Sequence, residues 1–203
     1  MADLQNKKRV YAYFDGSNFY HNAKNNYGIT SVNFLALSNN LIDLKQEEIK
    51  QIFYFNTPLN SQDDPGKYAQ QQRFFAKVRA TPFTKFIPGN FVRRPLGKIH
   101  INCKQCGHQH SDTLKCPKCS CEIPVSSCSK ITEKGVDVHL AIKMILDGID
   151  DNYDIVLLFS GDADFSPAIQ YIVNKLNKQV IYCCFPRPKT SQLRQVCSSM
   201  RII

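Results

Sequence analysis

The sequence has no apolar run that approaches the roughly 18 residues needed to cross a bilayer, and residues 1–9 are polar and lysine-rich, without the apolar h-region of a signal peptide after them. We therefore expect a cytoplasmic protein that does not enter a membrane. A dinucleotide-binding glycine fingerprint and a P-loop are also absent, because the Gly-Lys pairs at 66–67 and 97–98 lack the rest of the motif. No nucleotide cofactor is therefore expected. No Ser-His-Asp or Cys-His set stands out, and His21 and His139 are interpreted as packed or surface side chains.

The composition favours a cytoplasmic chain with an anionic partner. Nine cysteines are an odd number in a chain with no export signal, which favours reduced thiols and a metal site over disulfides. The net charge of +9 indicates an anionic partner, and it is unevenly distributed. Residues 88–134 hold eight basic and three acidic side chains, whereas residues 135–203 hold seven of each. The middle of the chain is therefore its most basic part.

Apolar runs alternate with segments that have helical spacing. The runs predict buried strands at residues 9–14, 52–55, 155–159 and 180–185, with a short last strand at 200–203. Helical spacing predicts helices around residues 34–41, 68–78, 136–149 and 169–176. Strands that alternate with helices imply right-handed crossovers. We therefore expect an α/β fold with a mainly parallel sheet flanked by helices.

Acidic residues follow two of the predicted strands. Asp15 and Asn18 come directly after the first strand, and Asp162 and Asp164 follow the strand at 155–159. The carboxyl ends of parallel strands meet at one edge of the sheet, so these side chains are expected to lie close together. Asp15 alone is equally well explained as a turn or helix-capping residue. Two acids at positions 162 and 164 repel each other unless a cation or a helix N-terminus offsets their charge.

Asp137 heads an apolar stripe on the predicted helix at 136–149, with Leu140, Ala141 and Met144 behind it at steps of three and four. We therefore expect its carboxylate to point toward the core side, where it is costly to desolvate unless it is paired or bound to a metal. The alternative is a first-turn acid that the helix dipole favours and solvent reaches.

Carboxylate and amide oxygens gathered at one edge suit Mg²⁺ or Mn²⁺. One or two such ions lower the pKa of a bound water and stabilise the leaving oxygen of a phosphate in an in-line displacement. The sequence therefore favours phosphodiester hydrolysis, with Asp15, Asp137, Asp162, Asp164 and Asn18 as the candidate catalytic residues.

Three blocks resemble the signature blocks of the NYN domain, in the LabA-like branch of the PIN-like nuclease superfamily. These blocks are residues 13–18 (YFDGSN), 134–138 (KGVDV) and 160–165 (SGDADF), and the last is the most specific of them. The resemblance implies a PIN-like Rossmannoid fold and metal-dependent cleavage of RNA. It also implies metal-site roles for Asp15, Asp137 and Asp162, with Asp164 and Asn18 supporting the site or binding metal through water.

A cysteine-rich segment at residues 99–128 interrupts this domain, which is expected to span residues 1–98 and 129–203. Two CxxC pairs, Cys103 with Cys106 and Cys116 with Cys119, are nine residues apart. Four thiolates at this spacing form a tetrahedral structural Zn²⁺ site with Zn–S distances of about 2.3 Å. The roles of Cys121 and Cys128 stay open. Cys183, Cys184 and Cys197 are interpreted as buried small apolar residues.

Basic residues surround this expected zinc ribbon, and phosphate neutralisation by them would give salt-dependent RNA binding. They are Arg93, Arg94, Lys98, Lys104, Lys115, Lys118, Lys130 and Lys134. The alternative is a solvated surface that keeps the protein in solution. The leading hypothesis is a metal-dependent endoribonuclease that acts on single-stranded RNA. A non-catalytic RNA-binding module and a DNA nuclease of the same mechanism remain alternatives, because no residue here recognisably reads the 2′-hydroxyl.

Overall fold

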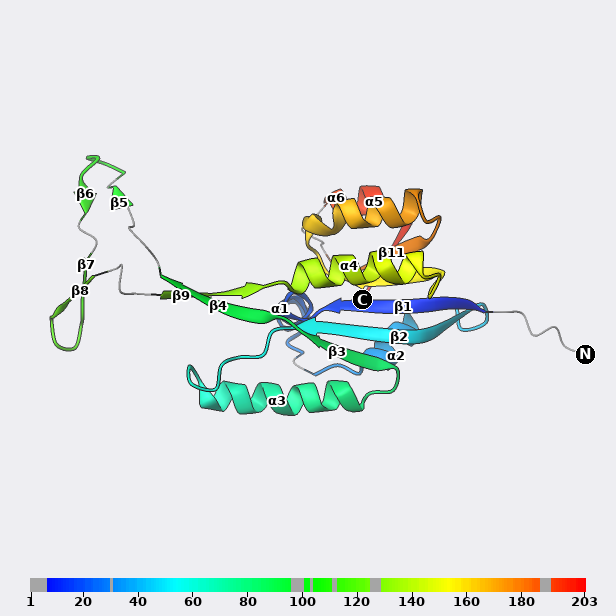
Figure 1. The fold of residues 1–203 in the computed structure, drawn as a ribbon, viewed down its shortest axis with the longest axis horizontal. Coiled ribbons are helices and arrows are strands. Elements are labelled where there is room, and N and C mark those ends of the chain that lie inside the picture. Colours follow the sequence, from blue (N-terminus) through cyan, green and yellow to red (C-terminus); the bar gives the residue numbers. More distant parts are fainter. Residues whose placement is uncertain are drawn as a thin grey trace, which may run out of the picture. The chain divides into compact units, whose positions relative to one another are not determined.

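Six parallel strands form the central sheet of the computed structural model, in the order β12-β11-β10-β1-β2-β3. Figure 1 shows β1, β2 and β3 side by side in this sheet. The strands are β1 Lys8–Asp15, β2 Glu47–Asn56, β3 Thr84–Pro88, β10 Ile155–Phe159, β11 Gln179–Cys184 and β12 Ser199–Ile202. The structure describes residues 7–29, 31–95, 101–102, 104–110, 113–124, 129–186 and 191–203. Every strand expected from an apolar run is present, and all are parallel, which confirms the expected sheet.

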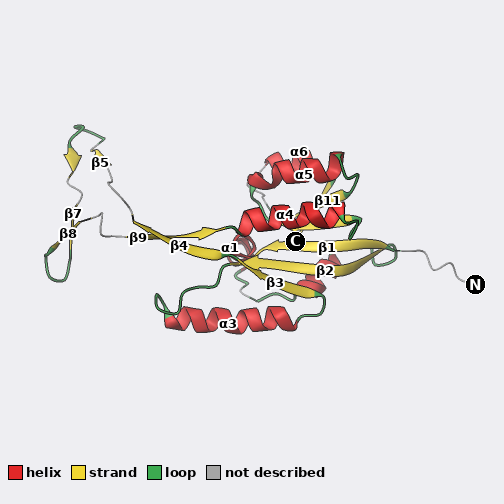
Figure 2. Cartoon of the chain, in the orientation of Figure 1, coloured by secondary structure: helices red, strands yellow, loops and turns green. Residues whose placement is uncertain are grey.

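Helices cover both faces of the sheet (Figure 2). Residues of the first three helices pack into one apolar core, and residues of the last three pack into the other. The first set is α1 Gly16–Tyr27, α2 Phe34–Asn40 and α3 Pro65–Ala80. The second set is α4 Val136–Ile149, α5 Ser166–Asn174 and α6 Ser191–Val196. The PIN-like Rossmannoid α/β fold expected from the sequence is therefore confirmed, whereas α1, β3 and α6 were not predicted.

The middle strands are apolar on both faces because both faces are covered. In β1, Ala12 and Phe14 enter the core shared with the first three helices, whereas Tyr13 enters the other core. All five residues of β10 are buried. This is the pattern expected for the centre of a parallel sheet, and it explains why these strands were the easiest to find in the sequence.

A buried polar cluster fixes α4 against β1. Asp147 is 2% exposed and accepts hydrogen bonds from Tyr13 Oη at 2.6 Å and from Lys143 Nζ at 2.6 Å. Asn152 Nδ2 donates to the same carboxylate at 3.2 Å. Because a buried carboxylate is stable only when it is paired and hydrogen-bonded, this cluster defines the position of the helix that carries Asp137.

The strand order changes direction between β1 and β10. From β1 the chain moves outward through β2 to β3, and from β10 it moves outward through β11 to β12. The connecting helices of these two halves lie on opposite faces of the sheet. In open α/β sheets, ligands bind at such a switch point, outside the carboxyl ends of the two strands.

Residues Phe91–Lys134 form a second compact unit, separate from Met1–Asn90 with Gly135–Ile203. It holds two antiparallel hairpins, β5 Ile101–Asn102 with β6 Gln109–His110, and β7 Thr113–Lys115 with β8 Glu122–Pro124. A further two-stranded sheet pairs β4 Asn90–Pro95 with β9 Ser129–Lys134. This unit includes the flanking strands and is therefore wider than the expected insert at 99–128. Across the described residues, no helix combines the length and the apolar character needed to span a bilayer.

Candidate active site

Asp15 ends β1 and caps the helix that follows. Its Oδ1 accepts a hydrogen bond of 3.1 Å from the backbone N–H of Asn18, and its Oδ2 accepts one of 2.8 Å from Ser160 Oγ. The side chain is only 5% exposed. The sheet register explains the second contact, because Phe14 pairs with Phe159 and the next residue on each strand lies alongside. The capping role that the sequence left open is therefore present, and it places a buried carboxylate at the switch point.

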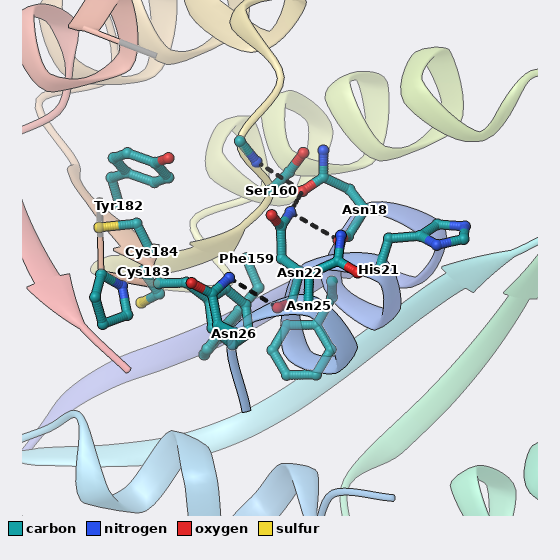
Figure 3. A pocket seen from close by; sticks show the side chains of 14 residues that line it. Asn18, His21, Asn22, Asn25, Asn26, Phe159, Ser160, Tyr182, Cys183 and Cys184 are labelled. Atoms are coloured by element: carbon teal, nitrogen blue, oxygen red, sulfur yellow. Dashed lines mark hydrogen bonds between the residues drawn. The ribbon is translucent and has the colours of Figure 1, made fainter. Parts of the chain in front are cut away.

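The loop after β10 is tied to α1 through an asparagine side chain. Asn18 Oδ1 accepts hydrogen bonds from the backbone N–H of Gly161 at 3.1 Å and from Asn22 Nδ2 at 2.8 Å (Figure 3). Asp15 and Asn18 both lie at the start of α1. The first turn of α1 therefore contacts the carboxyl ends of β1 and β10 and fixes their positions relative to each other. The expected meeting of residues that follow the first strand and the 155–159 strand is seen here.

Asp162 caps the short 3₁₀ helix Ala163–Phe165. Its Oδ1 accepts a hydrogen bond of 3.0 Å from the backbone N–H of Asp164, and its own N–H donates to Ser160 Oγ at 3.2 Å. Ser160 therefore joins Asp15 and Asp162 through one hydroxyl. Asp162 is half-buried and Asp164 is exposed. Ser160 begins the block at residues 160–165 but was given no role in the site, although its place directly after a buried strand is a signal for one.

Asp137 lies in the first turn of α4 and is exposed. Solvent therefore reaches it, as the alternative left open by the sequence states. Around the helix axis Asp137 lies about 100° from Val136, between Met144 at about 80° and Gly148 at about 120°, so it shares the angular range of the buried residues of α4. Its exposure therefore comes from its place in the first turn and not from its direction.

The three acids do not form a closely packed ligand set. Within the described parts of the chain, one group of three Cys, His, Asp or Glu side chains has its ligand atoms within 4.8 Å of one another, and it is Cys116, Cys119 and Cys121. Asp15, Asp137 and Asp162 do not form a second group that meets this distance among the described residues, and their role as metal ligands stays a prediction. Asp15 and Asp162 are connected through Ser160, and α4, which carries Asp137, packs against β1 and the 3₁₀ helix.

The cysteines of the second unit gather in a way that the sequence left open. Cys119 Sγ lies 2.9 Å from Cys121 Sγ, and hydrogen bonding from the Cys121 and Cys116 side chains lowers the pKa of Cys119. Cys106 is exposed and lies outside this group. Cys103 and Cys128 lie outside the described residues. In the sheet unit, Cys183 and Cys184 are buried as expected, and Cys197 is half-buried.

The basic residues expected to bind nucleic acid are exposed where the structure describes them. These are Arg93, Lys104, Lys115, Lys118 and Lys134. Lys98 and the side chains of Arg94 and Lys130 lie outside the described residues. Exposed cations are what phosphate binding requires, but they are equally what a solvated surface presents.

A pocket of about 520 Å³ adjoins the acidic site and shares Asn18, Ser160 and Gly161 with it. Figure 3 shows the asparagines of α1 facing Tyr182, Cys183 and Cys184 at the end of β11 across this pocket. The sequence did not single out this pocket, because α1 was not predicted. The recurrence of asparagine at positions 18, 22, 25 and 26 is the signal that could have revealed one polar helix face.

Comparisons with known proteins agree with this architecture. No curated protein matches the chain. A crystal structure of a Vibrio parahaemolyticus protein of unknown function is similar, with a TM-score of 0.64 and 19% sequence identity, over 100% of this chain and 96% of that one. At this identity, the similarity shows the fold alone. The NYN domain model matches residues 9–203, which includes all the acidic residues discussed above. The chain therefore belongs to the NYN domain family, whose members are generally PIN-like nucleases.

Proposed function

We propose that this protein is a divalent-metal-dependent endoribonuclease of the LabA-like branch, with its acidic site at the switch point between β1 and β10. One observation carries the proposal: Ser160 hydrogen-bonds both to the buried carboxylate of Asp15 and to the backbone of Asp162. Two acids from distant parts of the sequence are thereby joined at the place where α/β sheets bind ligands. The match of the NYN domain model supports the same reaction class.

The chemistry of the donors fits a hard cation such as Mg²⁺ or Mn²⁺. All the candidate ligands are oxygen atoms, from Asp15, Asp137, Asp162, Asp164 and the amide of Asn18. Mg²⁺ keeps several of its waters when proteins bind it, so acids that are further apart than direct ligands can still hold it through those waters. Such an ion supplies positive charge that stabilises the charge developing on a phosphodiester during hydrolysis.

The residues of the chain contribute position and charge. Asp15 is held rigidly by two hydrogen bonds, so its carboxylate is fixed before any ligand arrives. Asn18 fixes the backbone of Gly161 and hence the loop that carries Asp162. Asp137 and Asp164 are exposed and therefore accessible to hydrated cations and to a polar substrate. Preorganised charge of this kind lowers the barrier because little reorganisation is needed during the reaction.

We assign the second unit a structural zinc ion and a role in RNA binding. Thiolates of the two CxxC pairs are the proposed zinc ligands, and the grouping of Cys121 with Cys116 and Cys119 makes Cys121 an additional candidate. The exposed basic residues would contact phosphates of single-stranded RNA. The free thiols of Cys183 and Cys184 are compatible with a reducing compartment, and we propose a cytoplasmic location.

The direct test is cleavage of a labelled single-stranded RNA by the purified full chain in Mg²⁺ or Mn²⁺, with a single-stranded DNA of the same sequence in parallel. We expect endonucleolytic products from RNA that vanish with EDTA and in Asp15→Asn and Asp162→Asn. The matched control is Asp150→Asn, which changes an exposed carboxylate at the far end of α4. Cleavage that persists in both site variants would indicate a contaminating enzyme. Faster cleavage of the DNA would reassign the substrate while keeping the mechanism.

A non-catalytic RNA-binding module is the second candidate, and one observation favours it. Both carboxylate oxygens of Asp15 already accept hydrogen bonds, as a structural helix cap requires. This candidate predicts salt-sensitive RNA binding with no product under any divalent ion. It also predicts that replacing Cys103 and Cys116 abolishes binding, whereas Asp15→Asn leaves RNA affinity unchanged.

A further inference from the structure

The lining of the pocket beside the acidic site is mainly uncharged. Of the described residues that line it, none is Lys, Arg, Asp or Glu, and His21, an exposed residue of α1, contributes an imidazole. Four asparagines come from one face of α1, and aromatic and sulfur-containing side chains come from the ends of β10 and β11. A volume of about 520 Å³ is within the range of small-ligand pockets, which is roughly 300–1,000 Å³. The ligand should therefore be compact, uncharged and rich in hydrogen-bonding groups.

We propose that this pocket binds a nucleobase of the RNA strand, next to the phosphodiester at the acidic site; the inference rests on the proposed function and adds a base-binding subsite to it. The two sites share Ser160, Gly161 and Asn18, so a strand whose phosphate lies at Asp15 would have a neighbouring base within reach of the pocket. Bases of single-stranded RNA are unpaired and can be splayed out into such a pocket.

The asparagines offer the donors and acceptors that a base edge needs. Asn22 donates through Nδ2 to the backbone oxygen and to Oδ1 of Asn18, which orients its own Oδ1 as an acceptor. Asn25 is exposed on the pocket side of the same helix face. Side-chain amides pair well with bases because each presents a donor and an acceptor side by side.

Tyr182 supplies a hydroxyl on the β11 side of the pocket. The residue is only 2% exposed and lines the pocket. Its hydroxyl oxygen would lie 3.6 Å from a Cβ placed on Gly161, so it is beside the loop that connects the two sites. Burial raises the pKa of Tyr182 to about 12, so the hydroxyl stays protonated and can donate. A base edge that enters the pocket would offer this hydroxyl an acceptor.

A phosphate is a poorer occupant than a base. Phosphate recognition relies on Arg, Lys or several backbone N–H groups, and the lining described above has no Arg or Lys. Ribose hydroxyls could also bond to amides, but a sugar has no planar apolar face to lie between α1 and the apolar end of β11. The base is thus the part of a nucleotide that matches both the polar and the apolar lining.

The test measures binding without any cleavage. The ¹⁵N-labelled full chain is titrated with the four nucleoside 5′-monophosphates and, as a control that lacks only the base, with ribose 5-phosphate. We expect at least one nucleotide to shift the side-chain amide resonances of Asn22 and Asn25 at millimolar concentration, and ribose 5-phosphate to leave them in place. Asn25→Ala and Tyr182→Phe should each weaken this binding about three- to ten-fold, since each removes hydrogen-bonding groups.

Asn40→Ala, at the exposed end of α2, is the matched control and should bind the nucleotide normally. The proposal is overturned if no nucleotide shifts these resonances more than ribose 5-phosphate does, or if the two pocket variants bind as tightly as the parent. If the protein binds a base in this pocket but does not cleave RNA, only the proposed nuclease function is wrong. If it cleaves RNA but binds no base in this pocket, only the present inference is wrong.

Discussion

The hydroxyl of Ser160 donates a 2.8 Å hydrogen bond to Asp15, and the same oxygen accepts the N–H of Asp162. Replacing Ser160 with alanine removes one hydrogen-bond donor from a carboxylate that is only 5% exposed. Hydrogen bonds to charged groups contribute roughly 1.5–3 kcal/mol, so we expect Ser160→Ala to lower the free energy of unfolding by about 2 kcal/mol in urea denaturation. If Asp15 acts in catalysis, RNA cleavage should fall at least ten-fold. Ser199→Ala, on the exposed face of β12, is the control and should change neither.

Gly16 leaves no room for a side chain. A Cβ at this position would lie 2.5 Å from the backbone oxygen of Phe55 and 2.6 Å from Cζ of Tyr54. Gly16→Ala should therefore destabilise the fold by about 2–3 kcal/mol and displace the neighbouring Asp15. Gly66→Ala is the comparison, because its nearest atom would be 3.5 Å away in the first turn of α3. The melting temperature of Gly66→Ala should be equal to or above that of the parent. Equal losses of stability in Gly16→Ala and Gly66→Ala would contradict the steric explanation.

Much of the fold could be predicted from local sequence, because buried parallel strands are continuous apolar runs and α4 has a clear apolar stripe. α1 escaped prediction because only Gly16, Phe19 and Ala23 of its twelve residues are buried, which leaves no strong periodicity. β3 is an edge strand with no fully buried residue, so its sequence has no continuous apolar run. Elements with a continuous apolar run or a clear apolar stripe can therefore be read from this sequence, whereas α1 and β3, which have neither, cannot.

The candidate site was predictable in location and less so in detail. Asp15 and Asp162 could be assigned to one edge because parallel strands end there together. The exposure of Asp137 could not be predicted, because helical spacing shows which residues share a face but not whether the first turn is covered by the rest of the fold. The bridging role of Ser160 depends on the register of β1 with β10, which local sequence does not define.

A charge cluster at the opposite edge of the sheet should make stability depend on pH. Arg9 binds Asp154 through Nη2 at 2.8 Å and Nε at 3.1 Å, and its backbone N–H donates to the same carboxylate at 2.7 Å. These hydrogen bonds from Arg9 lower the pKa of Asp154. A carboxylate with a lowered folded-state pKa stabilises the fold above its unfolded pKa of about 4, and this contribution is lost as the pH falls through the folded value.

We therefore expect Asp154→Asn to lower the free energy of unfolding by about 1 kcal/mol at pH 7, a modest value because the side chain is one-third exposed. The difference from the parent should shrink as the pH falls from 5 toward about 3, as measured by urea denaturation at each pH. The control is the exposed carboxylate variant Asp150→Asn, which should be as stable as the parent at pH 7. If the free energy of unfolding of Asp154→Asn were lower than that of the parent by the same amount at every pH, the loss of stability would come from packing and not from charge.

The grouping of Cys116, Cys119 and Cys121 makes a prediction about zinc. We expect the purified chain to carry about one Zn²⁺, and Cys121→Ser to weaken zinc binding at least ten-fold in competition with a chelator. Affinity should fall with decreasing pH, because the thiols must lose their protons to bind metal. Cys197→Ser, in the sheet unit, is the control and should retain zinc. An unchanged zinc affinity in Cys121→Ser would indicate that Cys121 is not a ligand and that the two CxxC pairs bind the zinc ion.

The position of β1 at the middle of the sheet has a consequence for synthesis on the ribosome. Val10 pairs with Ile155, so the hydrogen bonds along one edge of β1 cannot form until about 145 further residues have been synthesised. At roughly 5–20 residues per second, that delay is about 7–30 s. During this time the face of β1 that later packs against α4 has no partner from the second half of the chain. We therefore expect nascent chains that stop before β10 to be the species that chaperones bind and that aggregates most readily.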